Sequence, residues 1–424
     1  MNPLPDLTFR GLVHQTTHPE ALGPWLAAAP RTLYAGFDPT ADSLHVGSLM
    51  PALLLRRFQK AGHRPIVLVG GATGMIGDPT GKSEERNLLS VDQLQKNVAG
   101  IAGQLRPLLD FDGERGALLL NNFDWMRGFS YLEFLRDVGK HFPVNSMLAK
   151  DSVKARLASD AGISYTEFSY MLLQAYDFAY LNQHHGCQLQ IGGSDQWGNI
   201  TAGIDLARRM HGAQLYGMTC PLLLKSDGAK MGKTERGAVY LAPERTSPYA
   251  FYQYWINVAD ADCASSLRFL TELSHEEIEA LDASRTSQPH LRESQKRLAD
   301  ELTRLIHGDS GLAAAKKATD IFFGAEISNL TDAQLTDIFA DVPSQSLPRE
   351  KLSGEGLPLA DALAESGLAK SKSEARRTIA QGGAYINNRP ITDTETRLTP
   401  SHLASESILV LRSGKKKYAL LKFS

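Results

Sequence analysis

The stretch that decides the fold runs from Thr32 to Lys82 and reads TLYAGFDPTADSLHVGSLMPALLLRRFQKAGHRPIVLVGGATGMIGDPTGK. Its first residues, Thr32–Phe37, are rich in strand-forming side chains. After a polar turn, the apolar run Leu49–Phe58 has helical spacing and stops before Gly62. The run Pro65–Gly70 predicts a second strand. The order strand, helix, strand predicts a parallel pair, and its first turn lies where open α/β sheets bind nucleotides.

The turn before the helix carries groups that suit a phosphate. Gly47 lets a ligand approach the backbone, and the free N–H groups of the first helical turn attract an anion. Thr40 and His45 can donate hydrogen bonds to phosphate oxygens. An ordinary β–α connection with a solvent-exposed histidine fits the same residues, because short motifs often match by chance.

A second glycine-rich segment, Gly77-Asp-Pro-Thr-Gly-Lys-Ser83, resembles a P-loop but has the wrong spacing. A P-loop needs four residues between its first glycine and the Gly-Lys pair, and that position here is Ile76. Pro79 also lacks an amide donor that a phosphate cradle would use. A P-loop NTPase is therefore the weaker interpretation.

Composition indicates a globular protein of two or three domains. The 424 residues are 42% hydrophobic and 22% charged, and no apolar run reaches the length of a membrane span. The N-terminal residues do not have the pattern of a secretory signal. Three widely spaced cysteines, Cys187, Cys220 and Cys263, favour neither a disulfide framework nor a zinc site. These features predict a cytoplasmic protein.

Strand and helix patterns alternate as far as residue 245, including a predicted strand at Pro221–Leu224, which favours a Rossmann-like doubly wound parallel sheet of the α/β class over residues 1–245. Residues 246–339 have helical periodicity throughout and predict an all-helical domain. Residues 340–358 are rich in Pro, Ser and Gly and predict a linker. Residues 359–424 predict a small α+β domain.

The C-terminal part is basic. From Lys351 to the end, the chain carries 12 Lys and Arg against 7 Asp and Glu, whereas the whole chain has a formal net charge of −2. This imbalance favours a polyanionic partner for the tail, although ordinary scatter of surface charge fits it as well.

Two pairs of cations could bind a polyphosphate. Lys230 and Lys233 lie in the segment Lys230-Met-Gly-Lys-Thr234, where glycines loosen the loop, and Lys82 and Arg86 follow the nucleotide-binding turn. Solvated surface lysines are the common alternative for such pairs.

One predicted helix carries polar side chains on an apolar face. Tyr170, Gln174 and Asp177 have the spacing i, i+4, i+7, so they share a face of the helix. Polar groups on a buried face need partners. They either line a small-molecule pocket or form a polar network within the core.

Taken together, these motifs resemble those of class I aminoacyl-tRNA synthetases. His45-Val-Gly-Ser48 and Lys230-Met-Gly-Lys-Thr234 are similar to the two signatures of that class, usually His-Ile-Gly-His and Lys-Met-Ser-Lys-Ser. Other stretches resemble the bacterial tyrosyl-tRNA synthetase family over essentially the whole chain: Tyr34-Ala-Gly-Phe-Asp-Pro-Thr40, Gly70-Gly-Ala-Thr-Gly-Met-Ile-Gly-Asp78, Tyr170-x-x-x-Gln174-x-x-Asp177 and Gln190-Ile-Gly-Gly-Ser-Asp-Gln-Trp197.

The resemblance implies a role for each matching residue. The residues implied to bind tyrosine are Tyr34, Asp78, Tyr170, Gln174, Asp177 and Gln196. Those implied to bind ATP are Gly36, Asp38, Gly47, Ser48, Gly192, Asp195 and Lys233. Those implied to act on the phosphates during catalysis are Thr40, His45, Lys82, Arg86, Lys230, Lys233 and Thr234. The tail resembles a small RNA-binding domain, and its implied tRNA contacts are Lys370, Lys372, Arg376, Arg377, Lys415, Lys416 and Lys417.

The implied partners are L-tyrosine, ATP with Mg²⁺, tRNA for tyrosine and a second copy of the chain in a homodimer; no carboxylate cluster suggests a dedicated metal site.

Three departures from the family pattern stand out: Ser48 replaces a histidine, Ala35 replaces a frequent cysteine, and Gly232 replaces a serine. Two other interpretations stay open. One is a related enzyme for tryptophan, which Tyr34 with Asp177 disfavours, and the other is an RNA-binding protein that has lost catalysis.

Overall fold

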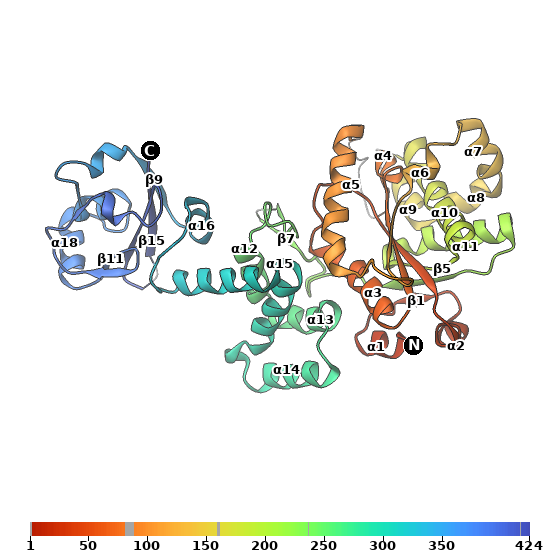
Figure 1. The fold of residues 1–424 in the computed structure, drawn as a ribbon, viewed down its shortest axis with the longest axis horizontal. Helices are drawn as coiled ribbons and strands as arrows, with labels where there is room; N and C mark the ends of the chain where they lie inside the picture. Colours follow the sequence, from red (N-terminus) through yellow and green to blue (C-terminus); the bar gives the residue numbers. More distant parts are fainter. Residues whose placement is uncertain (1, 81–88, 159–161, 236, 416) are drawn as a thin grey trace. The chain divides into compact units, whose positions relative to one another are not determined.

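The computed structural model describes residues 2–80, 89–158, 162–235, 237–415 and 417–424, and it divides into two compact units (Figure 1). The first unit comprises Met1–Thr246 and Trp255–Ile306, and the second comprises Ser247–Tyr254 and His307–Ser424. No helix in the described ranges combines the length and apolar character that crossing a membrane requires.

The main sheet of the first unit has six strands within the described residues, in the order β1-β6-β5-β2-β3-β4. Their bounds are β1 (Gln15–Thr16), β2 (Thr32–Phe37), β3 (Arg64–Val69), β4 (Leu118–Asn121), β5 (Cys187–Gly193) and β6 (Tyr216–Cys220). β1 pairs antiparallel with β6, and the other neighbours are parallel. The strand order reverses between β2 and β5, so their carboxyl ends form a topological switch point. The predicted doubly wound α/β sheet is confirmed.

Helices cover both faces of this sheet, with α3 and α5 on one side and α10 and α11 on the other (Figure 1). The helices as far as residue 211 are α1 (Leu4–Phe9), α2 (Pro19–Ala28), α3 (Leu49–Lys60), α4 (Thr73–Ile76), α5 (Val91–Leu105), α6 (Phe123–Met126), α7 (Tyr131–Asp137), α8 (Val144–Leu148), α9 (Asp151–Leu157), α10 (Tyr165–His185) and α11 (Trp197–His211). Alternate residues of β2 and β3, such as Tyr34 and Ile66, pack with Phe178 and Leu206 in one apolar cluster.

The strand predicted at Pro221–Leu224 is wrong. The observed strand, β6, ends at Cys220, immediately before the first residue of the predicted strand, and all five residues of β6 are buried. Pro221 cannot donate to the ladder and therefore ends it. Gly217 weakened the strand pattern of the true segment, because glycine contributes no side chain to it.

Beyond residue 246 the chain is helical as predicted: α12 (Pro248–Ile256), α13 (Asp260–Leu270), α14 (His275–Ser287), α15 (Glu293–Phe322) and α16 (Asp332–Ile338). These helices are divided between the two units and do not form one body of their own. α15 crosses the division close to Gly308, whose backbone is non-helical with φ 71° and ψ 179°. That conformation is accessible essentially only to glycine.

The second unit is built on a sheet with the order β12-β11-β14-β15-β9. Its strands are β9 (Ser344–Leu347), β11 (Ala384–Ile386), β12 (Arg389–Ile391), β14 (Ile408–Ser413) and β15 (Lys417–Phe423), and a second pair joins β10 (Leu357–Pro358) to β13 (Arg397–Leu398). The helices α17 (Leu359–Glu365) and α18 (Lys372–Ala380) pack on one face, with Leu409 and Leu411. The end of α15 and α16 pack on the other, with Ile408 and Val410.

The linker predicted at 340–358 does not match this arrangement. β9 lies within it and pairs in parallel with β15, with Ser344 opposite Leu420 and Leu347 opposite Phe423. Only Leu347 of this edge strand is buried, so its sequence, SQSL, has no apolar alternation to reveal it.

Candidate active site

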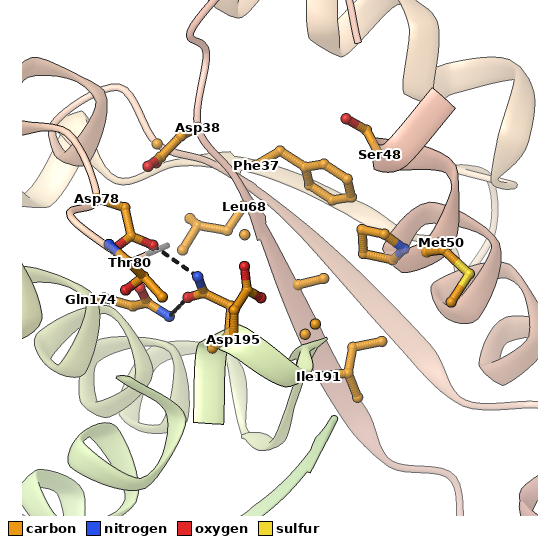
Figure 2. A pocket seen from close by; sticks show the side chains of 18 of the residues that line it. Phe37, Asp38, Ser48, Met50, Leu68, Asp78, Thr80, Gln174, Ile191 and Asp195 are labelled. Atoms are coloured by element: carbon orange, nitrogen blue, oxygen red, sulfur yellow. Dashed lines mark hydrogen bonds between the residues drawn. The ribbon is translucent and has the colours of Figure 1, made fainter. Parts of the chain in front are cut away.

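A cavity of about 340 Å³ opens at the carboxyl ends of β2 and β5 (Figure 2). Most of the predicted site residues line it: Tyr34, Gly36, Asp38, His45, Gly47, Ser48, Asp78, Tyr170, Gln174, Asp177, Gly192, Asp195, Gln196 and Lys230. Figure 2 shows Asp78, Gln174 and Asp195 on one side of the cavity, and Ser48 and Met50 on the opposite side. Residues far apart in the sequence therefore converge at the switch point of the sheet.

Tyr34 and Asp177 form a buried polar pair in this cavity, with exposed fractions of 1% each. Within the described residues the Tyr34 hydroxyl has no hydrogen-bond partner, although it is fully buried. Burial and the neighbouring Asp177 hold the pKa of Tyr34 well above its ordinary value, so it is a neutral donor. An orphaned buried hydroxyl is costly, and a ligand that pairs with it removes that cost.

The Asp177 carboxylate is held by two donors that the sequence interpretation missed. Asn122 Nδ2 donates to Oδ2 at 2.9 Å, and Trp125 Nε1 donates to Oδ1 at 2.9 Å. Burial raises the pKa of Asp177 to about 7, and the charge of Asp38 adds to this, while the two donors lower it. Asn122 follows directly after β4, where polar residues at the carboxyl end of a parallel strand are a recognisable signal.

A chain of hydrogen bonds links this pair to the rest of the cavity. Asn122 Nδ2 also donates to Thr73 Oγ1 at 3.0 Å, and Thr73 donates to Asp38 Oδ1 at 2.9 Å. Tyr170 donates its hydroxyl to Asp38 Oδ2 at 2.8 Å. Asp38 thus fixes the orientation of Tyr170, in addition to lining the cavity.

A second network involves Asp78, Gln196, Gln174 and Asn199. Gln196 Nε2 donates to Asp78 Oδ2 at 2.8 Å, and Gln174 Nε2 donates to Gln196 Oε1 at 3.1 Å; Figure 2 draws both bonds. Asn199 Nδ2 lies 3.0 Å from Gln174 Oε1. Because Gln174 lies one turn of α10 before Asp177, the spacing i, i+4, i+7 was a sound predictor of a shared polar surface.

The cationic end of the cavity contains His45, Gly47, Ser48 and Lys230. The pKa of Asp195 is raised by partial desolvation and by Asp78, whereas the positive charge of Lys230 lowers it. Lys230 therefore lies close enough to the cavity carboxylates to affect them.

The backbone of Val239 bridges the two signature segments. Val46 N donates to Val239 O at 3.0 Å, and Val239 N donates to Gly232 O at 2.8 Å. Gly232 has φ +83°, and a Cβ atom there would lie 2.8 Å from the Val46 Cβ. Glycine is the residue that suits this conformation and this close approach.

Several predicted residues lie elsewhere. Thr40, Lys233 and Thr234 are exposed and are not among the lining residues; Lys233 and Thr234 form β7, which pairs with β8 (Gly237–Ala238). Lys82 and Arg86 lie outside the described residues, as does Lys416. In the second unit, the remaining predicted tRNA contacts are exposed: Lys370, Lys372, Arg376, Arg377, Lys415 and Lys417.

Family models match two parts of the chain. Residues 27–324 match the model of class I tRNA synthetases (W and Y), and residues 334–421 match that of the C-terminal domain of tyrosine–tRNA ligases of the SYY type. The tyrosine–tRNA ligase of Rhodopirellula baltica is 61% identical over 98% of this chain and 95% of its own length. That of Roseiflexus castenholzii is 54% identical over 99% of each chain.

Solved structures agree with these matches. The C-terminally truncated mitochondrial tyrosyl-tRNA synthetase of Coccidioides posadasii is 32% identical, covers 75% of this chain and 91% of its own, and has a TM-score of 0.66. A tryptophanyl-tRNA synthetase from Plasmodium falciparum, which is 15% identical and covers 79% of this chain and 87% of its own, shares the fold with a TM-score of 0.53.

Proposed function

Because the chain belongs to the class I tRNA synthetases for tryptophan and tyrosine, we propose that it is a tyrosine–tRNA ligase. It activates L-tyrosine with ATP to give tyrosyl-adenylate and pyrophosphate, and it then transfers tyrosine to the 3′ end of its tRNA. The full-length similarity to curated tyrosine–tRNA ligases supports this activity.

The observation that carries the choice of tyrosine is the buried hydroxyl of Tyr34 beside Asp177, which has no hydrogen-bond partner in the part of the chain that the structure describes. A phenol hydroxyl can donate to the Asp177 carboxylate and accept from Tyr34 at the same time. An indole N–H only donates, so tryptophan leaves Tyr34 unpaired, and phenylalanine leaves both groups unpaired. Rejection of phenylalanine on this principle, on the order of 10⁵-fold, is already known for tyrosyl-tRNA synthetases.

The remaining polar groups place the rest of the amino acid. Asp78, Tyr170 and Gln174 bind the ammonium group, with a carboxylate, a hydroxyl and an amide facing one cavity. Gln196, which is bonded to both Asp78 and Gln174, lies close to the reacting carboxylate. The network holds these acceptors in place before substrate arrives, which reduces the ordering cost of binding.

ATP occupies the other end as its Mg²⁺ complex. Gly36, Gly192 and Asp195 lie beside the ribose and base, where the absence of side chains on the glycines permits close approach. His45, Gly47 and Ser48 face the phosphates, together with Lys230. The family resemblance assigns the leaving pyrophosphate also to Thr40, Lys233 and Thr234, which are exposed and lie outside the cavity lining, and to Lys82 and Arg86, which lie outside the described residues.

The activation step needs no general base, because the tyrosine carboxylate is already ionised. It attacks the α-phosphorus, the bond to the β-phosphate oxygen breaks, and pyrophosphate leaves with the electron pair. The protein contributes positioning and stabilisation of the charge that develops on the phosphates. A terminal ribose hydroxyl of tRNA then attacks the tyrosyl carbonyl, the bond from that carbonyl carbon to the phosphate oxygen breaks, and AMP leaves as the hydroxyl proton passes to its phosphate.

The second unit and the helices before it bind tRNA. Exposed cations around α18 and at the β14–β15 turn suit phosphates, with an affinity that falls as the salt concentration rises.

The chain also acts as a homodimer in the cytoplasm. Large apolar side chains of the α7–α10 region are exposed, among them Tyr131 (64%), Leu132 (75%), Val144 (59%) and Tyr165 (60%), and burial of such side chains in a symmetric interface is favourable.

The test is amino-acid-dependent exchange of pyrophosphate into ATP, measured with tyrosine, tryptophan and phenylalanine. We expect exchange with tyrosine and far less with the other two. Exchange driven by tryptophan would favour the related tryptophan enzyme. Absence of exchange with all three, with tRNA binding intact, would favour an RNA-binding protein without catalysis.

A further inference from the structure

The hairpin that carries Lys230 is attached to α13, a helix outside the cavity. Within the hairpin, Met231 N donates to Leu223 O at 3.0 Å and Lys225 N donates to Ala229 O at 2.8 Å. At its tip, Ser226 N donates to the Asp262 Oδ1 of α13 at 2.6 Å. Asp262 is only 7% exposed, and a buried carboxylate is tolerated only where it is well hydrogen-bonded. One of the hydrogen bonds that the Asp262 carboxylate accepts comes from the backbone of the hairpin.

A second contact lies one turn further along α13. Ser266 Oγ is 3.5 Å from Met231 Sδ and 2.7 Å from the carbonyl oxygen of Asp262. Ser266 is fully buried and Met231 is 4% exposed. The side chain next to Lys230 is therefore packed against the same helix that binds the hairpin tip.

The other end of α13 is bound by α3, the helix that follows the first signature. Arg57, in the last turn of α3, donates to Phe269 O at 3.0 Å and to Thr271 O at 2.7 Å. Arg10 donates to the Leu273 carbonyl at 2.7 Å. These carbonyls lie at and just beyond the negative end of the α13 dipole, where cations are favourable. Burial and the nearby Arg10 lower the pKa of Arg57 to about 10, so it stays charged at neutral pH.

These contacts form a closed ring of interactions between the two signature segments, α13 and α3. The first signature is linked to the second through Val46, Val239 and Gly232. The hairpin that carries the second signature contacts α13 through Ser226 and Met231, and the end of α13 is bound by the end of α3. This ring of interactions fixes the position of Lys230 relative to the start of α3, and the residues that form these contacts do not line the cavity.

We propose that Asp262 is a positioning residue for the phosphate end of the cavity. It acts through the amide of Ser226 and touches no substrate. The proposal rests on the proposed function, because it assigns Lys230 to the phosphates of ATP. Release of the hairpin tip lets Lys230 sample positions away from the reacting phosphate, and a displacement of about 1 Å can cost on the order of 10²-fold in rate.

Asp262→Ala, Asp262→Asn and Asp260→Ala test this proposal. Asparagine keeps an Oδ1 acceptor for Ser226, so Asp262→Asn retains kcat for pyrophosphate exchange to within about threefold, whereas Asp262→Ala loses about 10- to 100-fold. Neither changes the Kd for tyrosine. Asp260, in the first turn of the same helix, binds Gln295 instead of the hairpin, so Asp260→Ala controls for general loosening of α13.

Hydrogen exchange of the Ser226 amide provides a readout that needs no activity. We expect exchange at this amide to accelerate at least tenfold in Asp262→Ala and to stay unchanged in Asp260→Ala. Unchanged exchange at Ser226 in Asp262→Ala, an equal loss of kcat in Asp260→Ala, or a parallel loss of tyrosine affinity would overturn the proposal. If wild-type protein shows no exchange of pyrophosphate, the proposed function fails, and the amide measurement still decides whether Asp262 holds the hairpin.

Discussion

The two ends of the cavity are built in different ways. At the end that we propose for tyrosine (the tyrosine end), buried and half-buried side chains hold one another: Asn122 and Trp125 bind Asp177, and Asp38 binds Tyr170. At the end that we propose for the phosphates (the phosphate end), Lys230 and His45 have exposed side chains, and their backbones form β-bridges with Leu224 and Tyr240. At the tyrosine end the structure preorganises the orientation of side chains, and at the phosphate end it preorganises the position of the backbone. Substitutions at the tyrosine end should therefore change the Kd for tyrosine, and substitutions at the phosphate end should change the rate of adenylate formation.

The largest effect is expected at the phosphate end. Lys230→Ala removes a cation from the charge that develops on the phosphates, and loss of one such group costs about 10²- to 10³-fold in kcat. The Kd for tyrosine, measured without ATP, should stay within about threefold of wild type. Equal losses in Kd and kcat would show that Lys230 contributes to ground-state binding and would remove the distinction between the two ends.

At the tyrosine end, Asn122→Ala and Trp125→Phe each remove one donor to the buried Asp177 carboxylate. Loss of one such bond costs about 1–2 kcal/mol, so tyrosine binding should weaken about tenfold in each variant. Trp125→Phe leaves an aromatic ring to stack on Tyr180, whose ring centroid lies 4.4 Å from that of Trp125, and therefore separates the lost bond from lost packing. Titration of tyrosine by calorimetry provides the comparison; an unchanged Kd in both variants would mean that Asp177 needs neither donor.

A change of pH should alter the affinity for tyrosine by a factor similar to that of the Asn122 and Trp125 variants. The pKa of Asp177 is raised to about 7 by burial, so about a tenth of this carboxyl is ionised at pH 6 and about nine-tenths at pH 8. The ionised form accepts from the substrate phenol, and affinity for tyrosine should rise up to about tenfold between these values. Asp177→Asn should bind tyrosine weakly and without this dependence. A rise in affinity toward acidic pH would indicate that the protonated form binds the substrate.

The smallest change is expected from Tyr34→Phe. The Tyr34 hydroxyl is buried and has no partner among the described residues, so its removal should stabilise the free protein by about 1 kcal/mol. Losing its bond to the substrate should weaken tyrosine binding about three- to tenfold. Thermal unfolding with and without tyrosine measures both effects, and the stabilising effect of the ligand should shrink. A variant less stable than wild type in the absence of tyrosine would show that the hydroxyl already has a partner.

All six residues predicted to bind tyrosine line the cavity, whereas several of those predicted to act on the phosphates do not, and the difference has a physical reason. Tyr170, Gln174 and Asp177 lie on one helix, and helical periodicity alone places them on a common surface. Asn122 and Trp125 come from a different strand and helix, and only the sheet order brings them to Asp177. The role of Gly232 depends on its contact with Val46, which no local pattern reveals.

The same reasoning explains the errors in the fold. β9 is a polar edge strand, so its pairing with β15 is visible only in three dimensions. The boundary between the two units, which falls between Ile306 and His307 inside α15, likewise depends on packing, because the helical sequence pattern continues on both sides of it. Element types followed from periodicity, whereas domain boundaries followed from long-range contacts.

The most direct test of the central claim compares Asp177→Asn with Lys230→Ala in single-turnover formation of the adenylate. The Kd for tyrosine and the rate at saturating tyrosine are measured for each variant. We predict that Asp177→Asn raises the Kd at least tenfold, whereas Lys230→Ala lowers the rate at least a hundredfold with a Kd close to wild type. If both variants changed the same parameter, the cavity would not have one end for the amino acid and another for the phosphates.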